Sequence, residues 1–271
     1  MTDEIAAIHA LPARAGRVVA VANQKGGVGK TTTAINIATS IAMSDRKVLL
    51  VDVDPQGNLS SGIGLKDRRA AAGTVYEALT TDGTNPSEFV LSTAIDNLSL
   101  MPANRNLTGA EIELVAFPER ERRLRLVLDP LRAQFDYIFI DCPPSLGLLT
   151  LNALVAANAV LIPLHCEYFA LEGLADLVGT MRRVRGALNP TLDIEGVLLT
   201  MYDDRTNLGQ LVARDVRDFF KDKVFNTIIP RNVRLGEAPS HGMPGVLYDA
   251  KSRGAAAYVA LAQEMLARRA A

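Results

Sequence analysis

A glycine-rich segment near the amino terminus has the residue types and spacing that bind phosphate. Residues 24–32 read Gln-Lys-Gly-Gly-Val-Gly-Lys-Thr-Thr and follow the apolar run 18–22. Its glycines, around Val28, are Gly26, Gly27 and Gly29. They let backbone N–H groups turn toward phosphate oxygens. Lys30 can reach the outer phosphates, the Thr31 hydroxyl can ligate Mg²⁺, and a helix starting there adds the positive end of its dipole.

The segment departs from the standard phosphate-binding loop at one position. That loop has a glycine five residues before Gly29, where this chain has Gln24, and Lys25 stands beside the loop. Phosphoryl transfer builds up charge, and a cation supplied by a partner accelerates it about 10³–10⁵-fold. Lys25 could therefore reach the phosphates held by a second subunit. An exposed lysine that only adds positive potential is an equal alternative.

Acidic residues follow two further apolar runs, 48–51 and 137–140. Asp141 is interpreted as the acid that holds Mg²⁺ through water, since an aspartate that ends a strand beside the loop faces the metal. Asp54 is the better candidate to orient the attacking water, because it lies in a loop that can sense a terminal phosphate. Asp52 could share the metal site or orient that loop. Strand-end aspartates are also common caps and turn residues.

The elements that must position these residues alternate along the chain. Short runs that are apolar on both faces lie at 18–22, 48–51, 98–101, 137–140, 160–164, 196–200 and 224–229. Helical spacing occurs at 33–43, 119–134, 171–188, 208–220 and 255–269. This alternation predicts an α/β fold with a doubly wound, mostly parallel sheet flanked by helices on both faces. The nucleotide would bind at the carboxyl ends of the strands.

The pattern favours one domain at 17–271, preceded by a flexible leader at 1–16. The span 65–106 has the weakest pattern and is interpreted as a surface excursion. The two cysteines, Cys142 and Cys166, have no metal-pair or disulfide spacing and are expected to be packed small residues in a reducing compartment. No secretory signal and no membrane span is expected.

Charge is balanced overall but not along the chain. Of 29 basic residues 14 lie after position 181, against 10 of the 30 acidic residues. This basic C-terminal third permits a surface that binds polyanions, although ordinary scatter of charge explains it equally well.

Several further segments make the chain resemble the ParA/Soj chromosome- and plasmid-partition ATPases, a branch of the deviant Walker A (SIMIBI-class) P-loop NTPases. Besides the loop, they are 52–58, 141–145, Met201-Tyr202-Asp203, Arg205-Thr206-Asn207, 229–235 and 237–240. The likeness runs from about Arg17 to the carboxyl terminus. It implies ATP and Mg²⁺ as cofactors and a sandwich homodimer with ATP that binds double-stranded DNA without sequence preference. A ParB-type partner would stimulate hydrolysis. The protein would be cytoplasmic, nucleoid-associated and not bound to a membrane.

The resemblance also implies roles for single residues. Lys25 would contact the partner's nucleotide, Gly26 would lie at the dimer contact, and Asp54 would be needed for hydrolysis. Thr32 would help to hold the inner phosphates. Residues expected to flank the adenine are Pro230 and Asn232. Those expected to contact DNA are Arg205 and Arg234, followed by Arg231. Both Arg231 and Arg234 could instead bind nucleotide or pair with Glu237.

Two other functions stay open. A MinD-like ATPase would cycle on membranes through an amphipathic final helix, but the helix at 255–269 has few basic residues along its polar face and is expected to dock on the sheet. A small-molecule P-loop synthetase would need a metabolite pocket, of which the sequence has no obvious motif.

Overall fold

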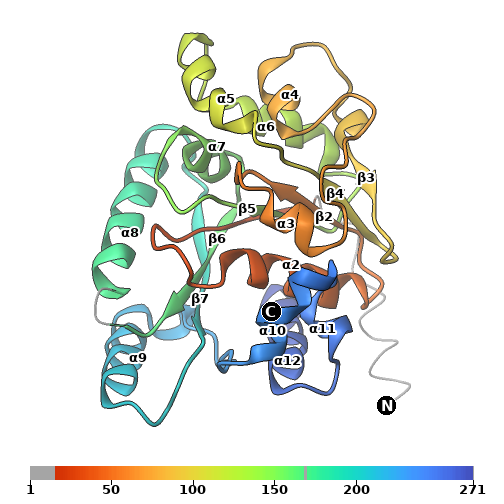
Figure 1. Cartoon of the computed structure of the whole chain (residues 1–271). Helices are drawn as coiled ribbons and strands as arrows, with labels where there is room; N and C mark the ends of the chain where they lie inside the picture. The colour runs from red at the N-terminus through yellow and green to blue at the C-terminus, as the bar shows by residue number, and fades with distance from the viewer. Residues whose placement is uncertain (1–15, 168–169, 271) are drawn as a thin grey trace.

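The computed structural model describes residues 16–167 and 170–270, and a seven-stranded sheet runs through its centre (Figure 1). The spatial order is β3-β4-β2-β5-β1-β6-β7. All neighbouring strands are parallel except β3, which pairs antiparallel with β4. The bounds are β1 Arg17–Val21, β2 Val48–Asp52, β3 Leu91–Ser92, β4 Leu98–Met101, β5 Tyr137–Asp141, β6 Ala159–His165 and β7 Asp193–Thr200.

Helices cover both faces of the sheet, because alternate residues of each buried strand point to opposite sides. Val18 and Leu49 pack beneath one set of helices, whereas Val19 and Val48 pack beneath the other. The first set is α4 Val75–Thr80, α5 Leu107–Glu113, α6 Arg123–Leu128, α7 Leu148–Ala156, α8 Ala170–Ala187 and α9 Asn207–Phe220. The second set is α2 Lys30–Ala42, α3 Asn58–Gly62, α10 Val233–Glu237, α11 Gly245–Tyr248 and α12 Arg253–Ala270. The doubly wound α/β prediction is confirmed.

The seventh predicted strand, at 224–229, is wrong. The segment runs beside β7, where Val224 bridges Val197, but it forms no strand. The backbone N–H groups of Asn226 and Thr227 donate instead to the Glu264 carboxylate of α12, at 2.8 and 2.9 Å. Those donors are therefore not available to a strand ladder.

Two other segments differ from expectation. The helix expected at 119–134 is only α6, followed by a 3₁₀ turn at Asp129–Leu131, because Pro130 cannot supply the N–H that a continuing helix needs. The span 65–106 is more than a surface excursion, since it adds β3 and β4 to the sheet edge and buries Leu79 and Phe89 in the core.

The final helix docks as expected. Tyr258, Leu261 and Met265 of α12 are fully or almost fully buried with the core beneath α2, and the Tyr258 and Thr33 hydroxyl groups are 3.1 Å apart. In the described part of the chain, no helix is both long enough and apolar enough to cross a bilayer.

Most of the expected leader, residues 1–15, lies outside the described residues. Gly16 was placed in that leader but belongs to the domain. Its N–H donates to the carbonyl of Arg132 at 2.7 Å, just before β1 begins.

Candidate functional site

The predicted phosphate-binding segment is a loop that joins β1 to α2. Gly27 and Gly29 have φ angles of 72° and 85°, which glycine adopts without steric penalty. A Cβ at either position would meet no other atom within 4 Å, so backbone conformation rather than lack of space favours glycine. Gly29 begins α2 with no side-chain cap, which leaves the first N–H groups of the helix for an anion.

The ends of neighbouring strands fix this loop in place. Asn23 accepts a hydrogen bond from the Lys25 N–H at 3.0 Å and donates to the Pro163 carbonyl at 2.7 Å. From the end of β7, the Thr200 hydroxyl donates to the Val28 carbonyl at 2.8 Å. The sequence alone assigns no role to Asn23 or Thr200. The only sequence signal for either residue is its place at the end of a strand: Asn23 follows β1, and Thr200 ends β7.

Lys30 lies inside the site. It is 7% exposed, and its ammonium donates to the Lys25 carbonyl at 3.2 Å. Burial lowers the pKa of Lys30, while the carboxylates of Asp141 and Asp54 oppose that shift. An ammonium has three donors, so it can also bind phosphate oxygens that enter the loop.

Asp141 ends β5 directly beside β1, where it pairs in register with Val21. It is fully buried, and neither carboxylate oxygen accepts a hydrogen bond from any described residue. Burial, followed by the charge of Asp52, raises the pKa of Asp141 well above its usual range, although the Thr31 hydroxyl nearby favours the charged form. The Thr31 hydroxyl thus lies near the Asp141 carboxylate but forms no hydrogen bond with it. An unpaired buried carboxylate next to a hydroxyl fits a magnesium ion that carries its own water.

Asp52 lies in register with Asp141 at the end of β2, but its oxygens are already used. One accepts the Asp54 N–H at 3.3 Å, and the other accepts the N–H and hydroxyl of Ser60 at 2.9 and 2.7 Å. Burial raises the pKa of Asp52 to about 6 despite these bonds. Of the two roles left open for Asp52, the geometry favours orienting the loop.

Asp54 begins a tight turn after β2. It is 7% exposed, its Oδ1 accepts the Gln56 N–H at 2.9 Å, and its carbonyl accepts the Gly57 N–H at 2.9 Å. Its carboxylate is close enough to Lys30 and Asp141 to act on the pKa of both. The fold thus brings Asp54 to the phosphate-binding loop, as the sequence predicts.

Thr31 and Thr32 form the first turn of α2. Both are half-buried and line a cavity of about 410 Å³ that also touches α3 and the residues after α10. The Thr32 carbonyl accepts a hydrogen bond from Asn36 at 2.8 Å. The cavity therefore lies next to the phosphate-binding loop and extends along α2.

Lys25 extends away from the buried end of the loop. Its side chain is 34% exposed and forms an ion pair with Glu167, just after β6. The second Glu167 oxygen lies 2.8 Å from Nδ1 of His165. The sequence alone assigns no function to Glu167 or His165, because no local pattern links them to Lys25, about 140 positions away.

The segment expected at the adenine, 230–232, lies beside the residues that come just after β6 and β7. Pro230 forms a bridge with Tyr202, and the Asn232 side chain caps α10 by accepting the Arg234 N–H at 2.9 Å. The hydrogen bond from Lys25 lowers the pKa of Glu167 most, and Arg231, which lies between Pro230 and Asn232, adds a smaller electrostatic contribution. The segment therefore lies, like Lys25, at the edge of the sheet where the strands end.

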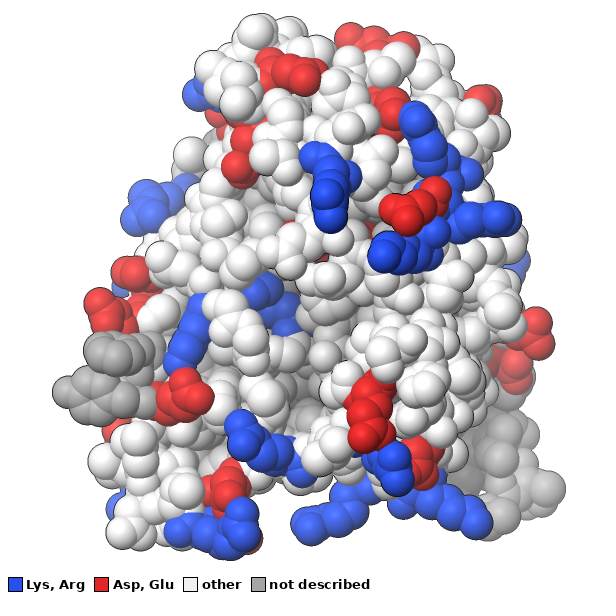
Figure 2. Space-filling model, viewed as in Figure 1, with Lys and Arg blue, Asp and Glu red and all other residues white. Residues whose placement is uncertain are grey.

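The arginines expected to contact DNA are exposed but paired. Arg205 binds Asp203 at 2.6 Å and lowers the pKa of that carboxyl to about 2. Arg234 lies 2.8 Å from Glu237 and 3.5 Å from Asp249. On the face in Figure 2, Lys and Arg lie along the lower edge and in a second group at the upper right. Acidic groups are interspersed among them.

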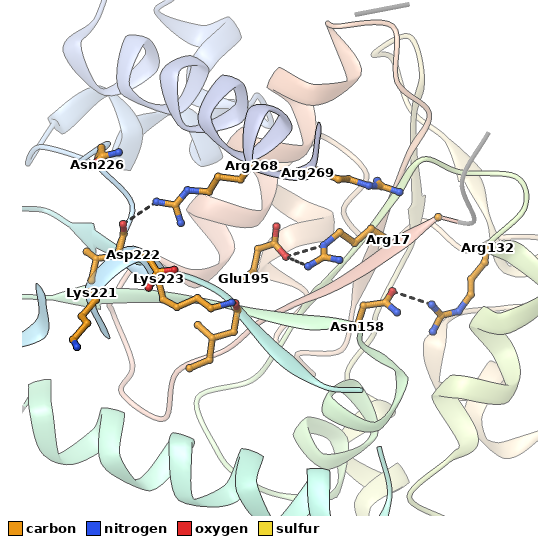
Figure 3. Close-up of a pocket in the computed structure, with 13 residues that line it drawn as sticks. Arg17, Arg132, Asn158, Glu195, Lys221, Asp222, Lys223, Asn226, Arg268 and Arg269 are labelled. Atoms are coloured by element: carbon orange, nitrogen blue, oxygen red, sulfur yellow. Dashed lines mark hydrogen bonds and ion pairs between the residues drawn. The ribbon is translucent and has the colours of Figure 1, made fainter. Parts of the chain in front are cut away.

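A second basic cavity, of about 860 Å³, lies at the opposite edge of the sheet, where the strands begin (Figure 3). Most of its cations are already bound within the chain. Arg17 donates to Glu195 at 2.8 Å, and Lys223 donates to Asp193 at 2.8 Å. The pairs tie strand starts to neighbouring elements. This cavity is not continuous with the phosphate-binding loop.

Both cysteines are buried and free, as expected for packed small residues. Burial raises the pKa of the Cys166 thiol to about 11 and raises that of Cys142 as well. A high thiol pKa disfavours the thiolate that metal or redox chemistry would need.

Comparison with known proteins agrees with this geometry. A family model described as an AAA domain matches residues 16–194. The chain is 56% identical to the chromosome partitioning protein ParA of Myxococcus xanthus, over 94% of this chain and 90% of that protein. It is 53% identical to the sporulation initiation inhibitor protein Soj of Bacillus subtilis, over 93% and 99% of the two chains.

A solved structure is similar throughout the domain. It is the cobyrinic acid a,c-diamide synthase of Mycobacterium smegmatis with bound ADP and magnesium, with a TM-score of 0.81 and 40% identity. The match covers 94% of this chain and 96% of that one.

Proposed function

Because this chain belongs to the ParA/Soj family of chromosome-partitioning ATPases, we propose that it works as an ATP-dependent sandwich dimer that binds DNA without sequence preference. It is an ATPase that uses ATP and Mg²⁺. A ParB-type partner would stimulate hydrolysis and thereby release the dimer from DNA. Binding to DNA would place the protein on the nucleoid.

One observation carries this proposal: the side chains of the two loop lysines lie in different surroundings. Lys30 is buried beside Asp141 and Asp54, whereas Lys25 is partly exposed and reaches outward. A buried lysine suits phosphates bound in its own loop. An outward lysine suits phosphates bound by a second subunit, where it would supply the neutralising charge.

Each residue of the site then has a task toward the nucleotide. Backbone N–H groups at 26–30 and the Lys30 ammonium would bind the phosphates, with Thr32 beside the inner ones. Thr31 would ligate Mg²⁺, and Asp141 would hold its water shell. Bound Mg²⁺ neutralises charge on the terminal phosphates. Asp54 would orient the attacking water, while Asp52 holds the Asp54 turn.

DNA binding is proposed for the exposed arginines Arg205, Arg234 and, secondarily, Arg231. In the described chain they lie on loops and a helix start rather than among exposed aromatic residues that could stack on bases, so contact with phosphates is favoured. Such binding weakens steeply with salt. ATP-driven pairing would double the number of arginines on one particle.

A mobility-shift titration tests this function. With a non-hydrolysable ATP analogue, DNA of unrelated sequences should bind equally. Arg234→Glu should still dimerise but bind DNA at least tenfold more weakly, with a salt slope lower by about two, because each dimer has two copies. Arg125→Glu on α6 is the matched control, since Arg125 is comparably exposed and also paired. Unaltered binding by Arg234→Glu would remove that residue from the interface.

The two rival functions are outcomes of the same experiments. Pelleting with anionic liposomes, without DNA binding, would indicate a MinD-like membrane ATPase, although the apolar face of α12 is buried in the core. ATP turnover stimulated by cobyrinic acid, but not by DNA with a ParB-type protein, would favour a small-molecule synthetase, the activity for which the M. smegmatis protein is named.

A further inference from the structure

The ion pair between Lys25 and Glu167 opposes the role proposed for Lys25. A lysine that must reach a partner's phosphates is bound here to a carboxylate of its own chain. We propose that Glu167 is a positioning residue that holds Lys25 on its own subunit, so that dimer assembly must release it. This inference rests on the proposed function of Lys25 and adds a residue that sets the threshold for assembly.

The fold brings the two residues together through neighbouring strands. β1 delivers the loop that carries Lys25, and β6, which pairs with β1, ends two residues before Glu167. Asn23 ties the start of the loop to Pro163 of β6 at 2.7 Å. The Glu167 backbone is fixed as well, because its N–H donates to His165 and its carbonyl accepts from Ala170. The carboxylate is therefore held at a set place beside the loop.

Glu167 is an acid among cationic and polar groups. Lys25 and Arg231 both act on it, the former by a direct hydrogen bond, and His165 lies against its second oxygen. Neutralising Glu167 would leave Lys25 and Arg231, which both act on this carboxylate, without their shared counter-ion. Their repulsion would favour movement of Lys25 outward.

The strength of the pair suits a reversible hold. The Glu167 side chain is 47% exposed and that of Lys25 is 34% exposed, and exposed pairs are weak. A terminal phosphate carries more charge than one carboxylate, so it can displace Glu167 from Lys25. A fully buried pair would resist this exchange.

Glu167→Gln tests the proposal in the full-length protein. Dimerisation with adenylyl-imidodiphosphate should be followed by sedimentation across protein and nucleotide concentrations. The variant should dimerise more readily, by a few-fold to about 30-fold in the association constant, because two weak pairs no longer have to break. Glu172→Gln, an exposed acid of α8 near the same edge, is the matched control and should leave dimerisation unchanged.

A second measurement separates positioning from structure. ADP affinity by calorimetry and the thermal midpoint of Glu167→Gln should equal those of the wild type, because a single subunit does not use Lys25 toward its own phosphates. Loss of either would indicate that Glu167 supports the loop itself and would overturn the proposal. Equal dimerisation of the variant would also overturn it, because Glu167 would then have no effect on assembly, and weaker dimerisation would place Glu167 in the dimer contact instead. If the wild type stays monomeric with the analogue, the proposed function fails instead.

Discussion

Asp52 and Asp141 end two neighbouring strands in register, so two fully buried carboxylates face the same edge of the sheet. They differ in what surrounds them. Asp52 accepts hydrogen bonds from Asp54 and Ser60, while Asp141 has no donor among the described residues. Burial and then the charge of Asp52 raise the pKa of Asp141, a cost that a bound cation would relieve. The pair thus divides into a structural acid and an acid that is free to support a metal.

Asp141→Asn should therefore weaken binding of ATP with Mg²⁺ by about ten- to a hundredfold, the usual cost of losing an outer-shell partner of a metal. Without Mg²⁺, in excess chelator, the variant and the wild type should bind ATP alike. Calorimetry under both conditions measures the difference. An equal loss with and without Mg²⁺ would mean that Asp141 supports the loop rather than the metal.

Substitution of the two loop lysines should affect different properties, ATP binding for Lys30 and dimerisation for Lys25. Lys30→Ala should lose most ATP binding, because it removes the buried ammonium that faces the phosphates. Lys25→Ala should bind ATP as a monomer with near-normal affinity but should not dimerise, since it removes only the outward cation. Calorimetry measures the first property and sedimentation with a non-hydrolysable analogue measures the second. Weak ATP binding by Lys25→Ala would place that lysine in its own subunit's site.

Asp54→Ala should bind ATP and remain dimeric, because the carboxylate that orients water is lost while Lys30 and the loop amides are kept. Steady-state hydrolysis should fall at least a hundredfold, within the range found for catalytic acids and bases. Sizing with ATP over several hours would show a persistent dimer. A monomer under these conditions would assign Asp54 to assembly instead.

Much of this site could be predicted because its residues are close in sequence. Gly27, Gly29 and Lys30 lie within one turn of chain, and Asp141 follows a run too apolar to be anything but a buried strand. The contacts of Thr200 with the loop and of Glu167 with Lys25 could not be predicted, since both residues lie far along the chain from the loop. Runs that are apolar on both faces likewise predicted six strands correctly, but the strand predicted at 224–229 was wrong. That segment is apolar enough for a strand, yet a carboxylate from the last helix takes its N–H groups.

That carboxylate gives a prediction about stability. Glu264 accepts hydrogen bonds from the N–H groups of Asn226 and Thr227 and from Arg268, which also donates to the Val224 carbonyl at 2.8 Å. The side chain is only 15% exposed. Glu264→Gln keeps one acceptor oxygen but loses the charge. It should lower the free energy of unfolding by about 1–3 kcal/mol at pH 7, the value of hydrogen bonds to a charged group.

The loss should depend on pH in a defined direction. Burial by itself would raise the pKa of Glu264, but the two backbone N–H groups and Arg268 lower it overall. A carboxyl whose pKa is lower folded than unfolded stabilises the fold above its unfolded pKa, about 4.3, and loses that contribution as the pH falls through the folded pKa. Urea unfolding at pH 7 and near pH 4 should therefore show the wild type and Glu264→Gln converging in acid. Glu172→Gln should stay within about 0.5 kcal/mol of the wild type at both pH values, as expected for an exposed side chain. A constant gap between Glu264→Gln and the wild type would mean that the glutamate stabilises by shape alone, without its charge.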